Sequence, residues 1–227
     1  MSTNQPETPA SIDDLYYARG EDVDNNRPVF TGDVFAAADP SEQKEPGAAF
    51  IIVQHPCALR VGGVELVDPV LVAQISQVQG TRSNWAKESI RQMPLPDLFL
   101  DGQHYAAKFT DLALVTRADI GGRERVAILS QHGVNLLLQR WVHHNSRVVV
   151  PTMTYNEQTT GEFEEADLAA EWCAERGPDG VAEFHDWIRT TDAGASATRQ
   201  KLLRNPQSRA TVRRAMNAEL RRLRAQP

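Results

Sequence analysis

The sequence predicts an α+β protein, in which a small antiparallel β-barrel is followed by an α-helical C-terminal extension. Short apolar segments between about residues 28 and 120 alternate with turns rich in Gly, Pro and Asp, a pattern typical of small barrels and sandwiches. From Ser130 onward, apolar residues recur at helical spacing. We therefore expect a flexible acidic segment over 1–27, a barrel with one helix over 28–152, and a helical extension over 161–227 that ends in a basic helix.

The barrel strands follow from apolar runs and turn signals. Runs of apolar and β-branched residues predict strands at about 28–37, 48–54 and 70–78. A short helix is expected at 83–92. The dipeptide Asp101-Gly102, which is favoured in type I′ turns, predicts a hairpin, and a further strand is expected over 112–120. The run Gly122-Arg123-Glu124-Arg125 that follows is expected to be a solvated basic turn.

The second half of the chain is predicted to be mainly helical. Ser130 is a suitable N-cap for a helix at about 130–145, and the apolar run at 148–155 predicts a closing strand. Further helices are expected at 164–175, 178–190, 195–204 and about 208–224. The last of these has one apolar stripe, formed by Val212, Met216, Leu220 and Leu223.

The composition is that of an ordinary globular protein, with 41% hydrophobic and 24% charged residues. We find no apolar run long enough for a membrane span and no signal-peptide pattern at the N-terminus. The two cysteines, Cys57 and Cys173, are far apart, so we expect reduced thiols in a cytoplasmic protein without membrane association. The abundance of Arg, Ala, Asp and Val favours a bacterial or phage origin.

The order of several short motifs carries a resemblance. Gly32-Asp33-Val34-Phe35 and Asp39-Pro40 are followed by Val72-Ala73-Gln74-Ile75-Ser76 and then by Val115-Thr116-Arg117-Ala118-Asp119-Ile120. This order resembles the SH3-like barrel of the PemK/MazF-like toxin family, over about half of the chain. The resemblance implies a cytoplasmic protein from a toxin–antitoxin, phage or defence setting, and a homodimer follows by analogy.

The resemblance also implies candidate catalytic residues. The family's toxins are endoribonucleases that need no metal or cofactor, and they use an arginine before the second strand and a Thr or Ser on the third. Here Ser76 takes the hydroxyl position, while Gly47-Ala48-Ala49 takes the arginine's place and Lys44 is the nearest cation. A nuclease would then use Ser76, Lys44 and His55. The missing arginine, whose forked donors suit phosphate, favours a barrel that binds without cutting.

His55 and Cys57 follow a predicted strand in the run Gln54-His55-Pro56-Cys57. We favour a strand-ending turn at the barrel rim, with Cys57 tucked into the core. Two alternatives remain open: a Cys57 nucleophile with His55 as its base, or half of a metal site. A thiol enzyme would alkylate faster at Cys57 than at Cys173. We expect no metal site, because no second pair of ligands completes His-x-Cys.

The two ends of the chain carry opposite charge. Residues 1–50 hold ten acids and three basic residues, and residues 197–227 hold nine basic residues and one acid, within a net charge of −6. The last helix would therefore either face solvent, dock on the acidic N-terminal segment, or bind a protein partner, RNA or DNA. Its candidate contact residues are Arg209, Arg213, Arg214, Arg221, Arg222 and Arg224.

Two functions are compatible with these patterns. The first is a non-catalytic binding module, with a barrel of PemK/MazF-like shape and a helical extension that engages a protein partner or nucleic acid. The second is a metal-independent endoribonuclease that uses the barrel pocket.

Overall fold

The computed structural model describes residues 5–39, 41–43, 47–80, 85, 90–177, 179–192 and 194–225. By its internal contacts the chain divides into two compact units. We call residues 1–23 and 30–156 the sheet unit, and residues 24–29 and 157–227 the helical unit. The mixed α+β class predicted from the sequence is confirmed, with a curled antiparallel sheet followed by helices.

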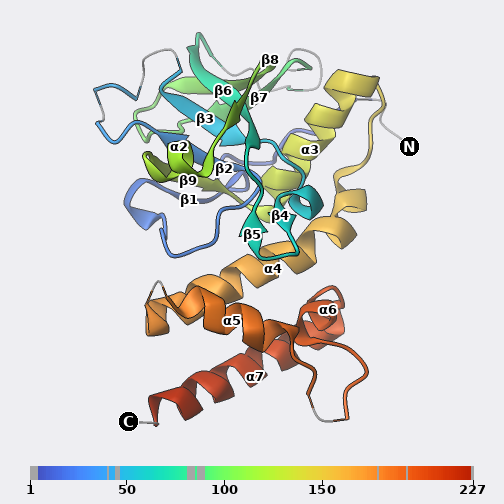
Figure 1. Ribbon diagram of the computed structural model, residues 1–227. Coiled ribbons are helices and arrows are strands. Elements are labelled where there is room, and N and C mark those ends of the chain that lie inside the picture. Colours follow the sequence, from blue (N-terminus) through green and yellow to red (C-terminus); the bar gives the residue numbers. More distant parts are fainter. Residues whose placement is uncertain are drawn as a thin grey trace. The chain divides into compact units, whose positions relative to one another are not determined.

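Seven antiparallel strands form the main sheet of the sheet unit, and Figure 1 shows how this sheet curls. Their order is β1 (Tyr16–Arg19), β9 (Glu124–Leu129), β2 (Asp33–Ala36), β3 (Ala49–Ile52), β6 (Val70–Val78), β8 (His104–Val115) and β7 (Gln92–Pro96). A small hairpin is formed separately by β4 (Arg60–Val61) and β5 (Glu65–Leu66). Short 3-10 helices are η1 (Gly20–Asp22) and η2 (Pro56–Ala58).

The predicted strands are partly correct. The strand at 70–78 is confirmed as β6, and β3 lies within 48–54, whereas β2 is much shorter than the predicted 28–37. The expected hairpin exists, since β7 pairs with β8. Its connection is longer than a two-residue turn, because Asp97 N–H donates to Gln103 O at 2.8 Å across the loop.

The predicted strand at 112–120 needs correction, and most of the predicted helix at 83–92 cannot be compared with the structure. The strand expected over 112–120 ends at Val115, because Thr116 caps the short helix α2 (Arg117–Gly121) in a reciprocal hydrogen-bond pair with Asp119. The helix expected at 83–92 falls mostly on residues outside the described ranges. Trp85 is helical there, and Gln92 already begins β7.

Strands β1 and β9 were not predicted. We expected residues 1–27 to be flexible, but Tyr16–Arg19 pairs with β9, and Leu15 is fully buried. We also expected 122–125 to be a solvated basic turn, but Glu124 begins the strand that lies between β1 and β2. Both expectations are wrong for the same reason: long-range pairing, which the local sequence does not encode, orders these segments.

Helix α3 (Gln131–Ser146) confirms the predicted helix and its cap. Ser130 Oγ accepts a hydrogen bond from Gly133 N–H at 2.9 Å. A Cβ at position 133 would lie 2.3 Å from Leu15 O, so only glycine allows α3 to approach the N-terminal chain this closely. The closing strand expected at 148–155 is wrong, because α4 (Thr152–Arg176) begins there.

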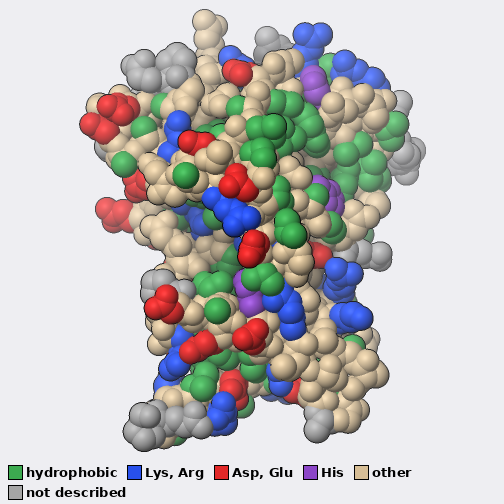
Figure 2. All heavy atoms as spheres, in the orientation of Figure 1, with side chains coloured by type: hydrophobic (Ala, Val, Ile, Leu, Met, Phe, Trp, Pro, Cys, Tyr) green, Lys and Arg blue, Asp and Glu red, His purple; other side chains and the backbone are tan. Residues whose placement is uncertain are grey.

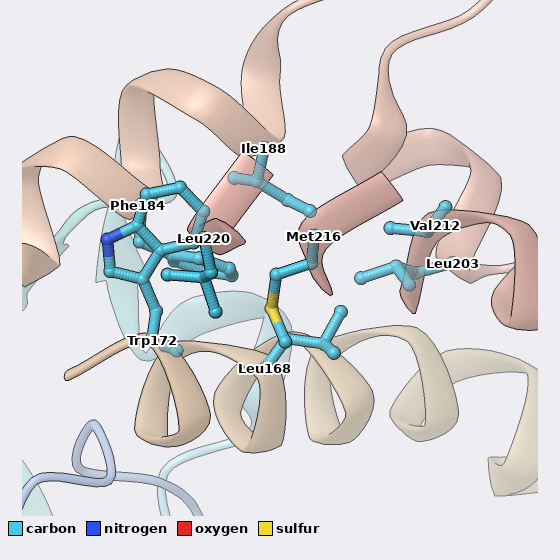
Figure 3. Close-up of a cluster of buried hydrophobic side chains, with 9 residues drawn as sticks. Leu168, Trp172, Phe184, Ile188, Leu203, Val212, Met216 and Leu220 are labelled. Carbon is cyan, nitrogen blue, oxygen red and sulfur yellow. The ribbon is translucent and has the colours of Figure 1, made fainter. Parts of the chain in front are cut away.

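The helical unit contains the rest of α4, followed by α5 (Gly180–Arg189), α6 (Arg199–Leu203) and α7 (Pro206–Arg224). Helix α6 is shorter than the predicted 195–204. Apolar side chains from all four helices meet in one core, shown in Figure 3. Its members are Leu168, Ala169, Trp172, Phe184, Ile188, Leu203, Val212, Met216 and Leu220. The predicted apolar stripe of α7 supplies three of them, because residues four apart lie on the same side of a helix.

Among the described residues, no helix combines the length and apolar character needed to cross a membrane.

Candidate functional site

Two of the predicted catalytic residues, Ser76 and His55, lie far apart in the described part of the chain. In the β3–β6 ladder Phe50 lies opposite Gln74, and continuing this register by two residues places Ala48 opposite Ser76. His55 lies beyond the other end of β3, seven residues from Ala48, or about 20 Å along an extended chain. A side chain cannot span that distance, so Ser76 and His55 do not share a site. Lys44 lies outside the described residues.

The turn predicted at His55 is confirmed. His55 caps η2, and its Nδ1 accepts a hydrogen bond from Cys57 N–H at 3.2 Å. This nitrogen is therefore engaged by the backbone and is not the base for the Cys57 thiol. Cys57 is exposed, which corrects the expectation that it packs into the core.

Cys173 differs from Cys57 in burial. It is buried in the helical unit, and this burial, reinforced by the nearby negative charge of Asp24, raises the pKa of its thiol. Within the described ranges no group of three His, Cys, Asp or Glu side chains is placed to hold a metal ion.

An open hollow of about 580 Å³ adjoins the ends of β2 and β3 in the sheet unit. It is lined by Ala37, Ala38, Glu42, Gly47, Ala48, Gly122 and Arg123. Arg123 is fixed there by its guanidinium, which donates through Nη1 to Ala48 O and through Nη2 to Gly47 O at 3.3 Å. Its Cζ lies 5.2 Å from the centre of the Phe50 ring.

The hollow therefore has an arginine, although the local sequence around 47–49 has none. Arg123 comes from the turn before β9 and reaches the backbone of Gly47 and Ala48, the stretch where the PemK/MazF-like resemblance expects an arginine. Sequence analysis missed this residue because it treated 122–125 as a turn. The alternation of Arg123 and Arg125 before the apolar run 126–129 was the signal for a strand with both arginines on one face.

One face of the sheet continues from Arg123 toward Ser76. Phe35 and Phe50 are paired across β2 and β3, and their ring centres are 5.8 Å apart. Because directly opposed residues project to the same face, Gln74 and then Ser76 continue the row on β6. Gln74 Oε1 and Ser76 Oγ are buried and make no hydrogen bond to the described part of the chain. Buried polar atoms of this kind normally have a partner.

The arginines of α7 fall into two groups, of which the first is engaged within the helical unit. Arg213 pairs with Glu171 and lies 3.6 Å from Glu164, and Arg224 pairs with Glu175, all three acids being on α4. Arg222 pairs with Glu219 on its own helix at 2.6 Å, and Arg209 Nε donates to Leu203 O at 2.9 Å. Glutamates of α4 therefore provide acids for this helix, and docking of the helix on the acidic N-terminal segment stays a prediction.

The second group consists of Arg214 and Arg221. Arg214 Nη2 donates to Thr211 Oγ1 at 3.2 Å, and Arg221 Nε donates to Asn217 O at 3.1 Å. Both side chains are exposed, and both partners are uncharged groups on the same helix.

The pairing with α4 affects protonation and net charge. Burial lowers the pKa of Arg213, but the hydrogen bond and charge of Glu171 outweigh burial and raise it above the ordinary value.

The helical unit as a whole holds thirteen acids and twelve basic residues, a net charge of −1. In Figure 2, red and blue side chains are interspersed over the part of the molecule that holds α4–α7. The +8 at the chain end therefore does not make the helical unit a positive body.

Comparison with known proteins gives no assignment: the chain matches no family model, no curated protein and no solved structure.

Proposed function

We propose that this protein is a non-catalytic binding module that engages a protein partner through its helical unit. In this proposal the curled sheet is an SH3-like barrel of PemK/MazF-like shape that is linked to the helical unit, in a toxin–antitoxin, phage or defence context. The observation that carries the proposal is the pairing of Arg213 and Arg224 with the glutamates of α4. It removes much of the positive charge that a nucleic-acid surface requires.

Nucleic-acid binding through α7 is disfavoured by electrostatics. Phosphates would have to displace the Glu164, Glu171 and Glu175 carboxylates from their arginines. They would also meet a helical unit of net charge −1. No aromatic residue lies on α7, so bases have no stacking platform there. A protein surface with a few carboxylates is a better match for the arginines that remain.

The proposal is tested with labelled single-stranded RNA in the presence of a chelator, with cleavage and binding followed together. We expect no cleavage, and no binding tighter than about 10⁻⁴ M at physiological salt, the weak limit of non-specific binding. Cleavage, or binding that survives physiological salt, would contradict a protein-binding module. The homodimer expected by analogy is tested on the same sample by light scattering coupled to gel filtration.

A second candidate, metal-independent RNA cleavage, is favoured by the hollow beside Arg123. The guanidinium of Arg123 is held in place by two backbone carbonyl groups and the Phe50 ring. Ser76 lies opposite Ala48 when the β3–β6 register is continued. Arg123 would stabilise the negative charge that grows on the phosphate, and Ser76 Oγ would position it by a hydrogen bond. In this candidate Arg123 replaces Lys44, and His55 has no role.

The two candidates separate in a variant series. If the hollow is a nuclease site, Arg123→Ala and Ser76→Ala each reduce cleavage by about a hundredfold, the size of a lost transition-state donor. The matched control is Arg117→Ala. Arg117 is exposed at the start of α2 and is paired with Glu65. Equal activity in the wild type, both variants and the control would assign any cleavage to a contaminant.

A further inference from the structure

The outer face of α7 (residues 207, 210, 211, 214, 218, 221 and 222) is opposite its core face. At 100° per residue, Val212, Met216 and Leu220 point to the core, while Arg214 and Arg221 point almost directly away from it. The two arginines are seven residues apart, so they lie on the same side, about 10 Å apart along the helix axis.

This face carries positive charge without any acid on it. Of its other residues, Gln207, Ala210, Thr211 and Ala218 are uncharged, and Arg222 is paired with Glu219 of the same helix. Arg214 and Arg221 bond only to uncharged groups of α7 among the described residues. By contrast, Arg213 and Arg224 lie on the flank of the helix and meet carboxylates of α4.

We infer that the outer face of α7 docks an acidic helical segment of a partner protein, with Arg214 and Arg221 binding carboxylates one heptad apart. Glutamates on a neighbouring helix already bind an arginine of α7, since Glu164 and Glu171 of α4 both lie beside Arg213. Two helices packed side by side keep the same rise, so acids at heptad spacing on a partner helix match Arg214 and Arg221.

This inference rests on the proposed function and names the partner's chemistry. An extended phosphate backbone would gain only two cations on this face, and its other charges would approach the carboxylates of α4. A helix with acids on one stripe neutralises both arginines and places its remaining faces away from α4. The charge of the face therefore favours an acidic helix over nucleic acid.

The test uses the full chain and a fluorescein-labelled, alanine-rich helical peptide with Glu at heptad spacing, titrated by fluorescence anisotropy at low salt. We expect Arg214→Ala/Arg221→Ala to weaken binding about tenfold, as expected for the loss of two exposed ion pairs. The matched control, Arg176→Ala/Arg224→Ala, makes the same change in net charge at arginines already paired with acids, and should bind within about twofold of wild type.

A charge reversal makes the test independent of folding. Arg214→Glu/Arg221→Glu should lose the Glu peptide and bind the corresponding Lys peptide, a gain that an unfolded protein would not give. No binding of the Glu peptide, or equal loss in the control variant, overturns the inference. Binding of labelled RNA that is lost in the Arg214/Arg221 variant also overturns it, and contradicts the proposed function as well. If the wild type binds neither the Glu peptide nor RNA, the inference alone is overturned.

Discussion

Arg125 and Asp33 form a buried ion pair in the sheet unit. Their side chains are 5% and 0% exposed, and Arg125 Nε lies 3.4 Å from Asp33 Oδ2. Asp33 also accepts a hydrogen bond from Phe30 N–H at 2.8 Å, and the Arg125 guanidinium lies over the Phe35 ring. The pair thus ties the loop before β2 to β9, and each charge depends on the other for compensation.

Loss of one member of this pair should be strongly destabilising. Arg125→Met leaves Asp33 charged and buried, so we expect the free energy of unfolding to fall by about 3–5 kcal/mol. The measurement is urea denaturation followed by circular dichroism. The control is Arg117→Met, which breaks the exposed pair with Glu65 and should change the free energy by about 0–1 kcal/mol. Similar losses in both variants would contradict the burial of the pair.

Glu7 makes the stability of the sheet unit depend on pH. Burial alone would raise its pKa, but hydrogen bonds from Thr152 and Gln139 outweigh burial and hold the pKa below its usual value of 4.5. Because the folded pKa is depressed, the stabilisation is present above pH 4.5 and is lost as pH falls through the folded pKa.

Thr152 N–H, at the start of α4, donates to the Glu7 carboxylate at 2.9 Å. We expect Glu7→Gln to lower stability at neutral pH by about 1 kcal/mol, similar to the loss of a helix N-cap, because this N–H loses its charged acceptor. The difference from wild type should shrink in acid. Melting temperatures measured between neutral pH and pH 3, with exposed Glu21→Gln as control, check this expectation. A difference that stays constant with pH would show that the charge of Glu7 is not responsible.

The two cysteines should react in a fixed order. Cys57 is exposed and should be alkylated rapidly in the native protein, whereas Cys173 is buried, has a raised pKa, and should react only on unfolding. Mass spectrometry of native and denatured samples measures this directly. The difference in exposure alone accounts for this order. A catalytic role for Cys57 would be indicated only if its alkylation rate were well above that of an unstructured thiol.

At the scale of elements, hydrophobic periodicity and capping residues predicted the strands and helices that local interactions determine. The nine-residue strand β6 and the Ser130-capped helix α3 carry their own periodicity and caps, so both were predicted with nearly correct limits. Strands β1 and β9 are short and charged at one end, and each is fixed by a distant partner. The turn at 122–125 was assigned from its charges, yet tertiary pairing makes it the origin of Arg123 in the hollow.

The core of the helical unit depends on a few side chains of α7. Met216 is fully buried, so Met216→Ala should reduce the stability of this unit by about 2–5 kcal/mol. Met153 is 78% exposed, and Met153→Ala provides a control of the same chemistry that should have almost no effect. The two variants are compared by thermal unfolding, followed by circular dichroism at 222 nm, where helices dominate the signal. Equal effects would contradict the core shown in Figure 3.

At the scale of the whole molecule, the positive charge at the chain end is balanced within the helical unit. Residues 1–50 carry −7 and residues 197–227 carry +8, which suggested docking between the two ends. In the structure, acids of α4 pair with α7, and Arg27 from the short segment 24–29 pairs with Asp167 of α4 at 3.0 Å. Composition gave the sign of each segment, but only the fold determines which helix neutralises which.

The central claim is that glutamates of α4 neutralise Arg213 and Arg224 of α7 and so prevent nucleic-acid binding. The most direct measurement compares the RNA affinity of wild type with that of Glu164→Gln/Glu171→Gln/Glu175→Gln, at low salt. The control is Glu21→Gln/Asp22→Asn/Glu124→Gln, which makes the same change in net charge in the sheet unit. We predict that only the α4 variant gains salt-sensitive RNA binding, by at least about tenfold. Wild-type binding as tight as that of the α4 variant would contradict the claim.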